Sequence, residues 1–486
     1  QYWKRRGIPG PSSRLYYGNS KELTNFNEPS PFQIYEWTKK YGPIYGIKEG
    51  VHNMLVISDI QLLNEVFVKQ FDTYYARREP ALASDPDSDP RMNLFGSRGS
   101  RWKRLRTLAS PSFSTNSLKK IMPIVEDSAI KLVDLMGTKH GGGEAFDASR
   151  YFNEFTLDTI CRLVLGQKES NLFGNPKLES FKSIFLVHFD RPIIHLALAL
   201  PQIAPVLREI GKRSNLPATR NVRELLSDIE KTVRKRVEER KECGPPSTPA
   251  DFIDIFLENE AEIDYKNHGE FSTQDRVQKA ITVDEVIGQV FVFLLAGYDT
   301  TSNALSYATW LLSRNQEVMR RCQEEVDEVC GDSSISFDDC QQLRYLDAAC
   351  KETLRLFPLA AKGVNRIPMK NTTIVGHEIE KGTTILADTY AIHFSKELWG
   401  EDAEEFRPER WLDPEKRVAA INFLSFGAGP RLCVGMRLAL MEEKILLAHI
   451  LRRFDILADD KMSNLKLIGC TTISPESVPV KIRSRN

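Results

Sequence analysis

The chain lacks an excess of charge of either sign. Its 486 residues include 66 Lys plus Arg and 66 Asp plus Glu, so the formal net charge is zero at pH 7. No overall field draws the protein toward nucleic acid, and nothing else in the composition supports nucleic-acid binding. Any electrostatic contact with a partner must therefore come from local patches.

Paired cysteines, long apolar runs and one common nucleotide motif are also missing. The eight cysteines form no C-x-x-C pair and no compact framework, which favours a reducing compartment over a disulfide scaffold. No run of about twenty apolar residues occurs, so no segment is predicted to span a membrane. G-x-G-x-x-G is absent, which argues against a flavin or nicotinamide site within the chain.

The first residues are aromatic and basic. The chain opens without Met, as Gln-Tyr-Trp-Lys-Arg-Arg-Gly-Ile-Pro-Gly-Pro. Aromatic residues followed by a basic cluster are typical of the cytoplasmic end of a membrane helix, and Pro and Gly favour a stiff hinge. We expect residues 1–12 to be a hinge that follows an N-terminal anchor absent from this chain. The alternative is a disordered basic tail.

One cysteine lies in a glycine-rich loop. Residues 426–435 read Phe-Gly-Ala-Gly-Pro-Arg-Leu-Cys-Val-Gly, and Gly427 and Gly429 allow backbone angles that let the loop lie against a flat ligand. From Val434 onward, apolar residues recur every three or four positions, which predicts a helix. Cys433 would lie beside its first turn, where N–H groups and the helix dipole favour a thiolate that serves as a nucleophile or metal ligand. A buried structural cysteine is the alternative.

A long helix is predicted from Thr282 to about Ser313. Thr-Val-Asp-Glu at its start is a capping box, and without proline the helix runs for roughly 45 Å. In its middle, residues 296–301 read Ala-Gly-Tyr-Asp-Thr-Thr, and an acid with two hydroxyls is costly to bury unless it serves a purpose. Thr300 can bond the carbonyl of Ala296 and open a groove. A kinked helix with capped hydroxyls is the alternative.

Two further motifs are ambiguous alone. Trp102 and Arg106 lie one turn apart on a predicted helix, where they share a face. Glu352 and Arg355 can pair on a later helix, and a Pro-Glu-Arg segment follows that ends at Arg410. Taken singly, these patterns are typical of a basic surface helix with a core tryptophan and of a solvated salt bridge.

Together, in this order, the four motifs resemble the cytochrome P-450 superfamily. The cysteine loop matches the haem-binding pattern Phe-x-x-Gly-x-Arg-x-Cys-x-Gly of that family. The resemblance covers essentially the whole chain and implies a mainly α fold with small β-sheets, as one haem domain over residues 1–486. The haem would lie between the long central helix and the helix after the cysteine. The chain looks most like animal microsomal drug-metabolising members of the branch that includes thromboxane synthase.

The resemblance assigns roles to matching residues. Cys433 is implied to be the thiolate ligand of the iron of haem b, where electron donation promotes O–O cleavage. Asp299 and Thr300 are implied to deliver protons to dioxygen. Further implied haem contacts are Trp102, Arg106, Ala296, Arg366, Phe426 and Arg431, of which the arginines and Trp102 would neutralise the propionates. Glu352, Arg355 and Arg410 are implied to form a structural triad, and the apolar substrate cavity is implied to be lined by Phe293, Leu359, Ala360, Val364 and Thr471.

The implied activity is a monooxygenase that inserts one oxygen atom of O2 into a lipophilic xenobiotic, steroid or fatty acid. Electrons would come from NADPH through a flavoprotein reductase, with cytochrome b5 as a further partner, at the cytoplasmic face of the endoplasmic reticulum membrane. A haem-thiolate isomerase of lipid peroxides and a non-catalytic haem or lipid binder are alternatives. A basic docking patch for the reductase is expected from Lys103, Arg104, Lys119, Lys120, Arg437 and Lys444, with a solvated surface as the alternative.

The remaining patterns predict strands and loops. Residues 44–57 read as two strands around a turn, followed by a capping box at 58–61. Residues 372–376 and 383–387 read as a second small sheet. Residues 81–100, 241–251 and 262–280 are predicted loops, and in the resembled family the first of these roofs the substrate cavity. The apolar stretch 181–207 favours either core or a lid that dips into lipid.

Overall fold

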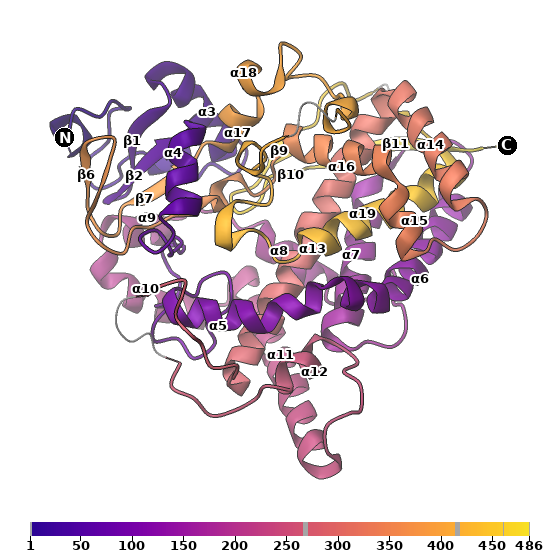
Figure 1. The fold of residues 1–486 in the computed structure, drawn as a ribbon, viewed down its shortest axis with the longest axis horizontal. Helices are drawn as coiled ribbons and strands as arrows, with labels where there is room; N and C mark the ends of the chain where they lie inside the picture. The colour runs from indigo at the N-terminus through magenta and orange to yellow at the C-terminus, as the bar shows by residue number, and fades with distance from the viewer. Residues whose placement is uncertain (1, 266–270, 414–417, 460, 486) are drawn as a thin grey trace.

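A computed structural model describes residues 2–265, 271–413, 418–459 and 461–485. Helices make up most of the fold, and small sheets lie near its two ends (Figure 1). Strands β1, β2 and β7 lie on the side of the N-terminus, and β11 lies on the side of the C-terminus. The expectation of a mainly α protein with small sheets is confirmed.

The long helix predicted from Thr282 is α13 (Val283–Arg314), and it runs through the centre of the fold. Its capping box is confirmed, because the backbone N–H of Glu285 donates to the Thr282 hydroxyl and the N–H of Thr282 donates to the Glu285 carboxylate, both at 3.2 Å. A helix that is apolar on most faces must be covered on most faces. The helices packed around α13 are α7 (Ala148–Leu165), α11 (Pro217–Cys243), α16 (Arg344–Leu356) and α19 (Met436–Arg453).

The outer helices complete the helical part of the fold. They are α1 (Tyr2–Arg5), α2 (Ser20–Leu23), α3 (Ser30–Tyr41), α4 (Ile60–Asn64), α5 (Gly99–Ala109), α6 (Thr115–His140), α8 (Leu178–Phe185), α9 (Pro192–Ala199), α10 (Ala204–Arg213), α12 (Phe252–Leu257), α14 (Gln316–Cys330), α15 (Phe337–Gln342), α17 (Thr389–His393) and α18 (Lys396–Trp399). A π-helix, η1 (Glu65–Lys69), extends α4, and a 3-10 turn, η7 (Gly429–Arg431), lies in the cysteine loop.

Four small sheets are present in the described residues. The first has the order β1-β2-β7-β4, with bounds β1 (Ile44–Glu49), β2 (His52–Ile57), β7 (Thr384–Ala387) and β4 (Asn365–Arg366). The second has the order β3-β11-β8, with bounds β3 (Phe146–Asp147), β11 (Pro479–Ser484) and β8 (Phe454–Ala458). Two hairpins remain, β5 (Thr372–Ile374) with β6 (His377–Ile379) and β9 (Leu467–Ile468) with β10 (Ser474–Pro475).

Two local predictions are wrong. Residues 383–387 do not pair with 372–376, because β7 is buried along its whole length and joins β2 in parallel within the core sheet. The strand β5 pairs instead with β6, across a turn at Val375 and Gly376 that has positive φ at both residues. The helix after β2 is capped by Asp59, whose side chain accepts from the Leu62 N–H at 2.8 Å, and not by the predicted box at 58–61.

The start of the chain packs against the first sheet. Gln1 of the predicted hinge lies outside the described residues, but Trp3 is buried and its indole N–H donates to the carbonyl of Ile47 at 2.9 Å. A Cβ at Gly46 would overlap the Trp3 ring, so glycine is needed for this approach. The beginning of the predicted 1–12 hinge is therefore docked rather than free, and the preceding anchor stays a prediction.

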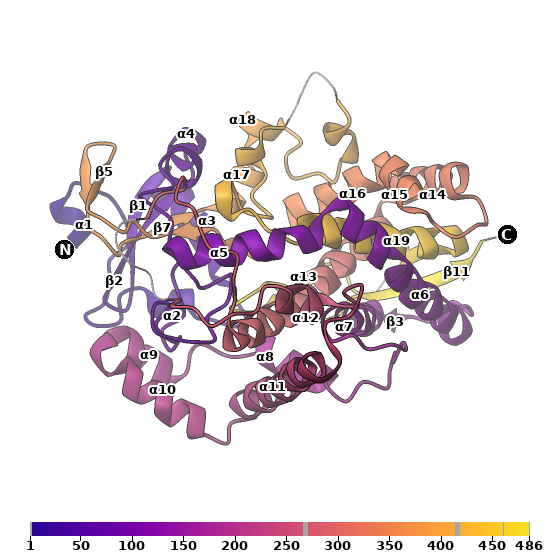
Figure 2. The ribbon, with the colours of Figure 1, turned by 60° about the horizontal axis from the view of Figure 1, so that its bottom comes forward.

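The apolar stretch 181–207 contains most of α8, all of α9, a 3-10 turn at Pro201–Ile203 and the start of α10, and α11 lies beside α8 and α10 (Figure 2). The stretch is not simple core, because Leu186, Leu196, Leu200, Ile203 and Val206 are exposed. No single helix in the described chain is long and apolar enough to cross a membrane; only the bent pair Pro192–Ala199 and Pro201–Arg213, with 113° between them, meets the length and composition criteria together.

The segments predicted as loops contain few helices or strands in the described part of the chain. Residues 241–251 are irregular after α11 ends at Cys243. Of the loop predicted at 262–280, residues 266–270 lie outside the described part, and the rest contains no helix or strand. Residues 81–98 are likewise irregular, so the roof expected over the site is a loop whose position depends on side-chain contacts.

Candidate functional site

The cysteine loop lies directly on η1. Gly429 has a φ of 68°, and a Cβ there would overlap the carbonyl oxygen of Phe67, so only glycine lets the two backbones approach this closely. The N–H of Cys433 donates to the carbonyl of Phe426 at 2.9 Å and closes the loop, and α19 begins three residues later at Met436. The predicted place of the cysteine beside the first turn of a helix is confirmed.

The Cys433 side chain is accessible to solvent although protein surrounds it closely. Desolvation raises the pKa of its thiol, while the N–H groups of Gly435 and Met436 and the guanidinium groups of Arg77 and Arg106 act in the opposite direction. The predicted influence of the helix terminus is present, because its N–H groups favour the thiolate, but desolvation outweighs it in the free thiol. A metal ion bound at the sulfur would favour the thiolate further.

No other metal-binding arrangement competes with Cys433 in the described part of the chain. It contains no group of three or more His, Cys, Asp or Glu side chains suited to hold a metal ion. The eight cysteines are free thiols, as the sequence pattern predicts. Those that are buried are Cys161, Cys322, Cys330, Cys340 and Cys350.

Four arginines converge beside the cysteine loop. Arg106 donates to the carbonyl of Leu432 at 2.7 Å, Arg77 to that of Arg431 at 3.0 Å, and Arg366 to that of Ala428 at 2.8 Å. Desolvation lowers the pKa of these three guanidinium groups and of the fourth, that of Arg431. It lowers the pKa of Arg77 to about 10. Charge of one sign is thus concentrated where solvent screens it weakly.

The arginine group is poorly compensated by protein. Among the described residues, Glu79 is the carboxylate that acts on the group, and desolvation raises the pKa of Glu79 itself. The Nε atoms of Arg77 and Arg366 are buried and have no hydrogen-bond partner in the described part of the chain. Buried donors left without acceptors are costly, so the group fits a ligand that carries carboxylates, as haem does in its two propionates.

Arg431, which lies against Trp102, also holds the irregular loop at residues 81–98. Arg431 is buried, and its guanidinium lies 4.8 Å from the centre of the Trp102 ring. It donates to the carbonyls of Tyr75 at 2.8 Å and of Phe95 at 3.2 Å, and also to that of Ser97. With these acceptors, Arg431 joins the cysteine loop to the segment before α5, so its direct contact with a propionate stays a prediction.

The middle of α13 presents an accessible polar face. Thr300 donates to the carbonyl of Ala296 at 2.7 Å, as predicted, although α13 continues through this point without a break. Ala296 is exposed and Thr300 half-buried, whereas most of the helix is covered. A small residue and a hydroxyl are thus the groups that α13 offers to a ligand here.

Asp299 is buried beside this face. Desolvation raises its pKa to about 6, although hydrogen bonds from Thr472 and Asn303 lower it. The Thr472 hydroxyl donates to the carboxylate at 2.6 Å. A carboxyl group with this pKa exchanges its proton near neutral pH, which suits a general acid.

The predicted triad is present. Glu352 accepts from Arg355 at 2.8 and 2.9 Å and from Arg410 at 2.8 Å, and all three side chains are buried. Trp411 also donates to Glu352 at 2.9 Å, and the N–H of Arg407 does so at 3.2 Å, so both carboxylate oxygens accept from more than one donor.

His393 connects this triad to the cysteine loop. Its Nδ1 lies 2.9 Å from the carbonyl of Arg355, and its Nε2 accepts from the N–H of Leu424 at 2.9 Å. Desolvation lowers the pKa of His393 to about 3, so the ring is neutral and can bond at both nitrogens. The triad therefore supports the loop through one histidine.

The predicted cavity residues are only partly together. Leu359 and Ala360 pack with Phe426, and Val364 packs in a cluster that contains Phe67 and Ala428 of the loop region. Phe293 is instead part of an aromatic group with Phe113, Phe252 and Phe256. Thr471 is exposed, and it is the next residue, Thr472, that reaches α13.

The predicted basic patch is smaller than expected. Arg104 is buried and paired with Glu285 at 2.7 Å, and Lys444 is buried and donates to the carbonyl of Cys340 at 2.7 Å, so both assignments are wrong. Lys103 donates to backbone carbonyls of the loop after residue 271. The exposed members at the starts of α6 and α19 are Lys119, Lys120 and Arg437.

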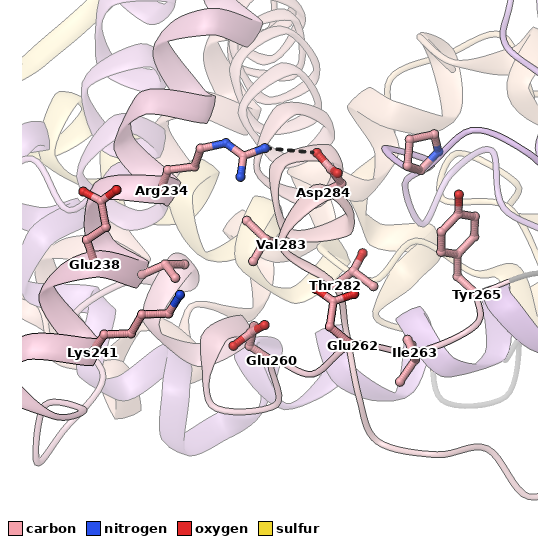
Figure 3. A pocket seen from close by; sticks show the side chains of 12 residues that line it. Arg234, Glu238, Lys241, Glu260, Glu262, Ile263, Tyr265, Thr282, Val283 and Asp284 are labelled. Carbon is pink, nitrogen blue, oxygen red and sulfur yellow. Dashed lines mark ion pairs between the residues drawn. The ribbon is translucent and has the colours of Figure 1, made fainter.

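A surface pocket lies away from this chemistry. It has a volume of about 400 Å³ and is formed between α11 and the start of α13, where Asp284 pairs with Arg234 at 3.7 Å (Figure 3). Asp284 lies twelve residues before Ala296, or about 18 Å along the helix. The pocket is therefore no part of the site around Cys433.

Sequence reasoning missed three residues of the site. Arg77 follows an irregular segment without a motif, and Thr472 lies in a hairpin whose partner helix is far away in sequence. His393 is the last residue of the short helix α17 and lies outside the four motifs. No local pattern pointed to any of the three.

These features define a class: a haem-thiolate protein, with an accessible cysteine before a helix, a cationic group for carboxylates and a central helix that presents a small residue and an acid–alcohol pair. The chain belongs to the cytochrome P-450 family, whose sequence profile matches residues 8–477, and it is a monooxygenase whose cofactor is haem.

Proteins named as cytochromes P-450 align with the whole length of this chain. The chain is 43% identical over 497 residues to cytochrome P-450 CYP13A3 of Caenorhabditis elegans, and 44% identical over 493 residues to cyp-13B1 of the same organism. CYP13A7, also from C. elegans, is 42% identical over 496 residues. Each alignment covers all of this chain and 95% of the relative. The thromboxane synthase branch and the single-domain assignment stay predictions.

Proposed function

We propose that the protein oxidises a lipophilic small molecule with O2 and with electrons that an NADPH-dependent flavoprotein reductase delivers. Haem held by Cys433 would supply the iron that activates dioxygen. The observation that carries the proposal is the buried carboxyl of Asp299 beside the accessible Thr300, because proton delivery is needed for reductive oxygen activation.

The chain's own residues divide the remaining work. Arg77, Arg106 and Arg366 would hold the carboxylates of the cofactor. Thr300 holds a hydroxyl at the face of α13, where it orients water, and Asp299 holds a proton at its carboxyl oxygens. Leu359, Ala360 and Val364 supply apolar contacts that favour a lipophilic substrate.

The proposed surroundings are the cytoplasmic face of the endoplasmic reticulum membrane. Exposed apolar residues on α9 and α10, among them Leu196 and Ile210, support contact with lipid. Lys119, Lys120 and Arg437 offer a small positive surface for an acidic reductase or for cytochrome b5.

The alternatives fit less well. A haem-thiolate isomerase of lipid peroxides needs no proton delivery, and such enzymes often lose the acid or the threonine. A non-catalytic binder likewise has no use for a buried acid, which destabilises the fold when ionised. The presence of Asp299 and Thr300 therefore favours the reductase-dependent reaction.

Replacement of Thr300 tests the proposal. The holoenzyme would be reconstituted with NADPH and the reductase and given a panel of lipophilic probes: an alkoxycoumarin, a steroid and a medium-chain fatty acid. In Thr300→Ala, product per NADPH consumed should fall by about tenfold or more, because one positioned proton donor contributes on this scale. Hydrogen peroxide should rise in proportion.

Thr309→Ala is the matched control. Thr309 lies on the same helix, is buried, and its hydroxyl has no hydrogen-bond partner among the described residues. It should retain the wild-type ratio of product to NADPH. Equal turnover without the reductase, or no product from any probe, would contradict the proposal.

A further inference from the structure

The β9–β10 hairpin docks along one polar stripe of α13. Asp299, Asn303 and Tyr307 are spaced four residues apart and so lie on one face of the helix. Each meets the hairpin in turn: the Thr472 hydroxyl donates to Asp299 at 2.6 Å, the Asn303 amide donates to the Ser474 hydroxyl at 2.9 Å, and the Tyr307 hydroxyl donates to the carbonyl of Ile473 at 2.9 Å. Three consecutive hairpin residues, 472–474, thus bond this one face of the helix.

The shape of the hairpin tip depends on a glycine. Gly469 has a φ of 121°, and a Cβ there would overlap the carbonyl oxygen of Thr472, so a larger residue could not close this turn. On its other side, the N–H of Ile473 donates to the carbonyl of Leu359 at 2.8 Å. The tip is therefore held between α13 and the apolar segment at Leu359, and the position of the Thr472 hydroxyl is fixed from both sides.

We propose that Thr472 is a positioning residue for Asp299, and that the tip of the β9–β10 hairpin thereby belongs to the proton supply of the site. The inference rests on the role of Asp299 proposed above. It adds a second element to the proton path, far from α13 in sequence.

The surroundings of Asp299 make this hydrogen bond decisive. Besides burial, the influences on its carboxyl are the hydrogen bonds from Thr472 and Asn303, neither of which carries a charge. The titratable groups on which Asp299 itself acts are Tyr298 and Tyr307 of the same helix, and burial keeps both phenols protonated. No cation among the described residues acts on the Asp299 carboxylate, so the 2.6 Å hydrogen bond from the Thr472 hydroxyl is its main anchor and fixes its rotamer.

The test replaces Thr472 by Val, which keeps the shape and removes the hydroxyl, and by Ser, which keeps the hydroxyl. The first readout is the carboxyl band of Asp299 in pH-difference infrared spectra of the resting protein, assigned by its loss in Asp299→Asn. Because the hydroxyl stabilises the ionised form, its removal should raise the midpoint by about one pH unit. Thr472→Ser should restore the wild-type midpoint.

The second readout is the pH profile of product formed per NADPH consumed with the probes named above. In Thr472→Val, the limb of the pH profile that depends on the ionisation of Asp299 should move upward by about one pH unit. The product formed per NADPH consumed should fall severalfold at the pH optimum of the wild type. Thr309→Val, a threonine on α13 without a hydrogen-bond partner among the described residues, should change neither readout.

The outcomes separate this inference from the proposed function. If Thr472→Val lost turnover equally at every pH, with the midpoints of the infrared titration and of the pH profile unchanged, Thr472 would be purely structural and the inference would be overturned. The proposed role of Asp299 would still stand in that case, provided that Asp299→Asn was impaired. If Asp299→Asn itself kept full coupling at all pH values, the proposed role of Asp299 would fail, and the inference with it.

Discussion

At the scale of single residues, Asp299 shows a conflict between stability and function. Its carboxyl is buried, and desolvation raises its pKa from 3.8 to about 6. An unfolded chain ionises this group near pH 4, whereas the folded chain resists ionisation up to about pH 6. At neutral pH the folded protein therefore carries a burial cost that an uncharged side chain would avoid.

Asp299→Asn should accordingly stabilise the fold at pH 7. The pKa of the Asp299 carboxyl is higher in the folded than in the unfolded chain. The burial cost of the ionised carboxylate is therefore absent below about pH 4 and grows as the pH rises to about 6. The gain should be on the order of 2 kcal/mol at pH 7 and should vanish at pH 4. Denaturant unfolding of both proteins at the two pH values measures it.

Asp332→Asn is the matched control, because Asp332 is exposed. It should change the unfolding free energy at neither pH. Asp299→Asn that destabilises the protein at pH 7 as much as at pH 4 would contradict the burial cost.

At the scale of elements, the triad shows why a common sequence pattern carries little weight alone. A pair three residues apart is usually a solvated ion pair of small value. Here Glu352 and Arg355 are fully buried, and the third partner comes from residues 408–411. Burial, which the pattern does not report, changes the consequence of losing one partner.

Glu352→Gln should therefore be strongly destabilising. It keeps the shape but removes the carboxylate that neutralises the buried Arg355 guanidinium, while Arg410 keeps only its longer pair with Asp402 among the described residues, at a cost of about 3 kcal/mol or more. Urea unfolding and haem content after purification measure the effect, and we expect haem to be lost because His393 links the triad to the cysteine loop.

Glu317→Gln is a suitable control, since Glu317 pairs with Arg320 at the same spacing on the exposed face of α14. It should leave the unfolding free energy and the haem content unchanged. Equal destabilisation by both substitutions would show that burial of the triad has no special effect.

Elements were predictable where a local pattern determines them. The capping box at Thr282 and the alternation in residues 44–57 identify α13 and the β1–β2 hairpin correctly. The pairing of β7 was not predictable, because a short buried strand finds its partner through tertiary packing and not through the adjacent turn. The same holds for Thr472, whose role depends on contact with a helix about 170 residues earlier in the chain.

At the scale of the whole molecule, the site is assembled from distant segments around α13 and the cysteine loop. Arg77, Arg106 and Arg366 come from three separate parts of the chain and meet carbonyls of one ten-residue loop. The motifs identified the family and its cofactor, but not that Arg104 and Lys444 are buried and unavailable to a partner. Burial of long charged side chains follows from the fold and not from the sequence pattern.

The most direct measurement of the central claim, that Cys433 binds haem iron as a thiolate, is the spectrum of the reduced protein under carbon monoxide. We expect the strongly red-shifted Soret band of thiolate ligation in the wild type, and its loss in Cys433→Ala with the fold largely retained. A band typical of histidine ligation, or no bound haem after expression with ample haem precursor, would contradict the claim.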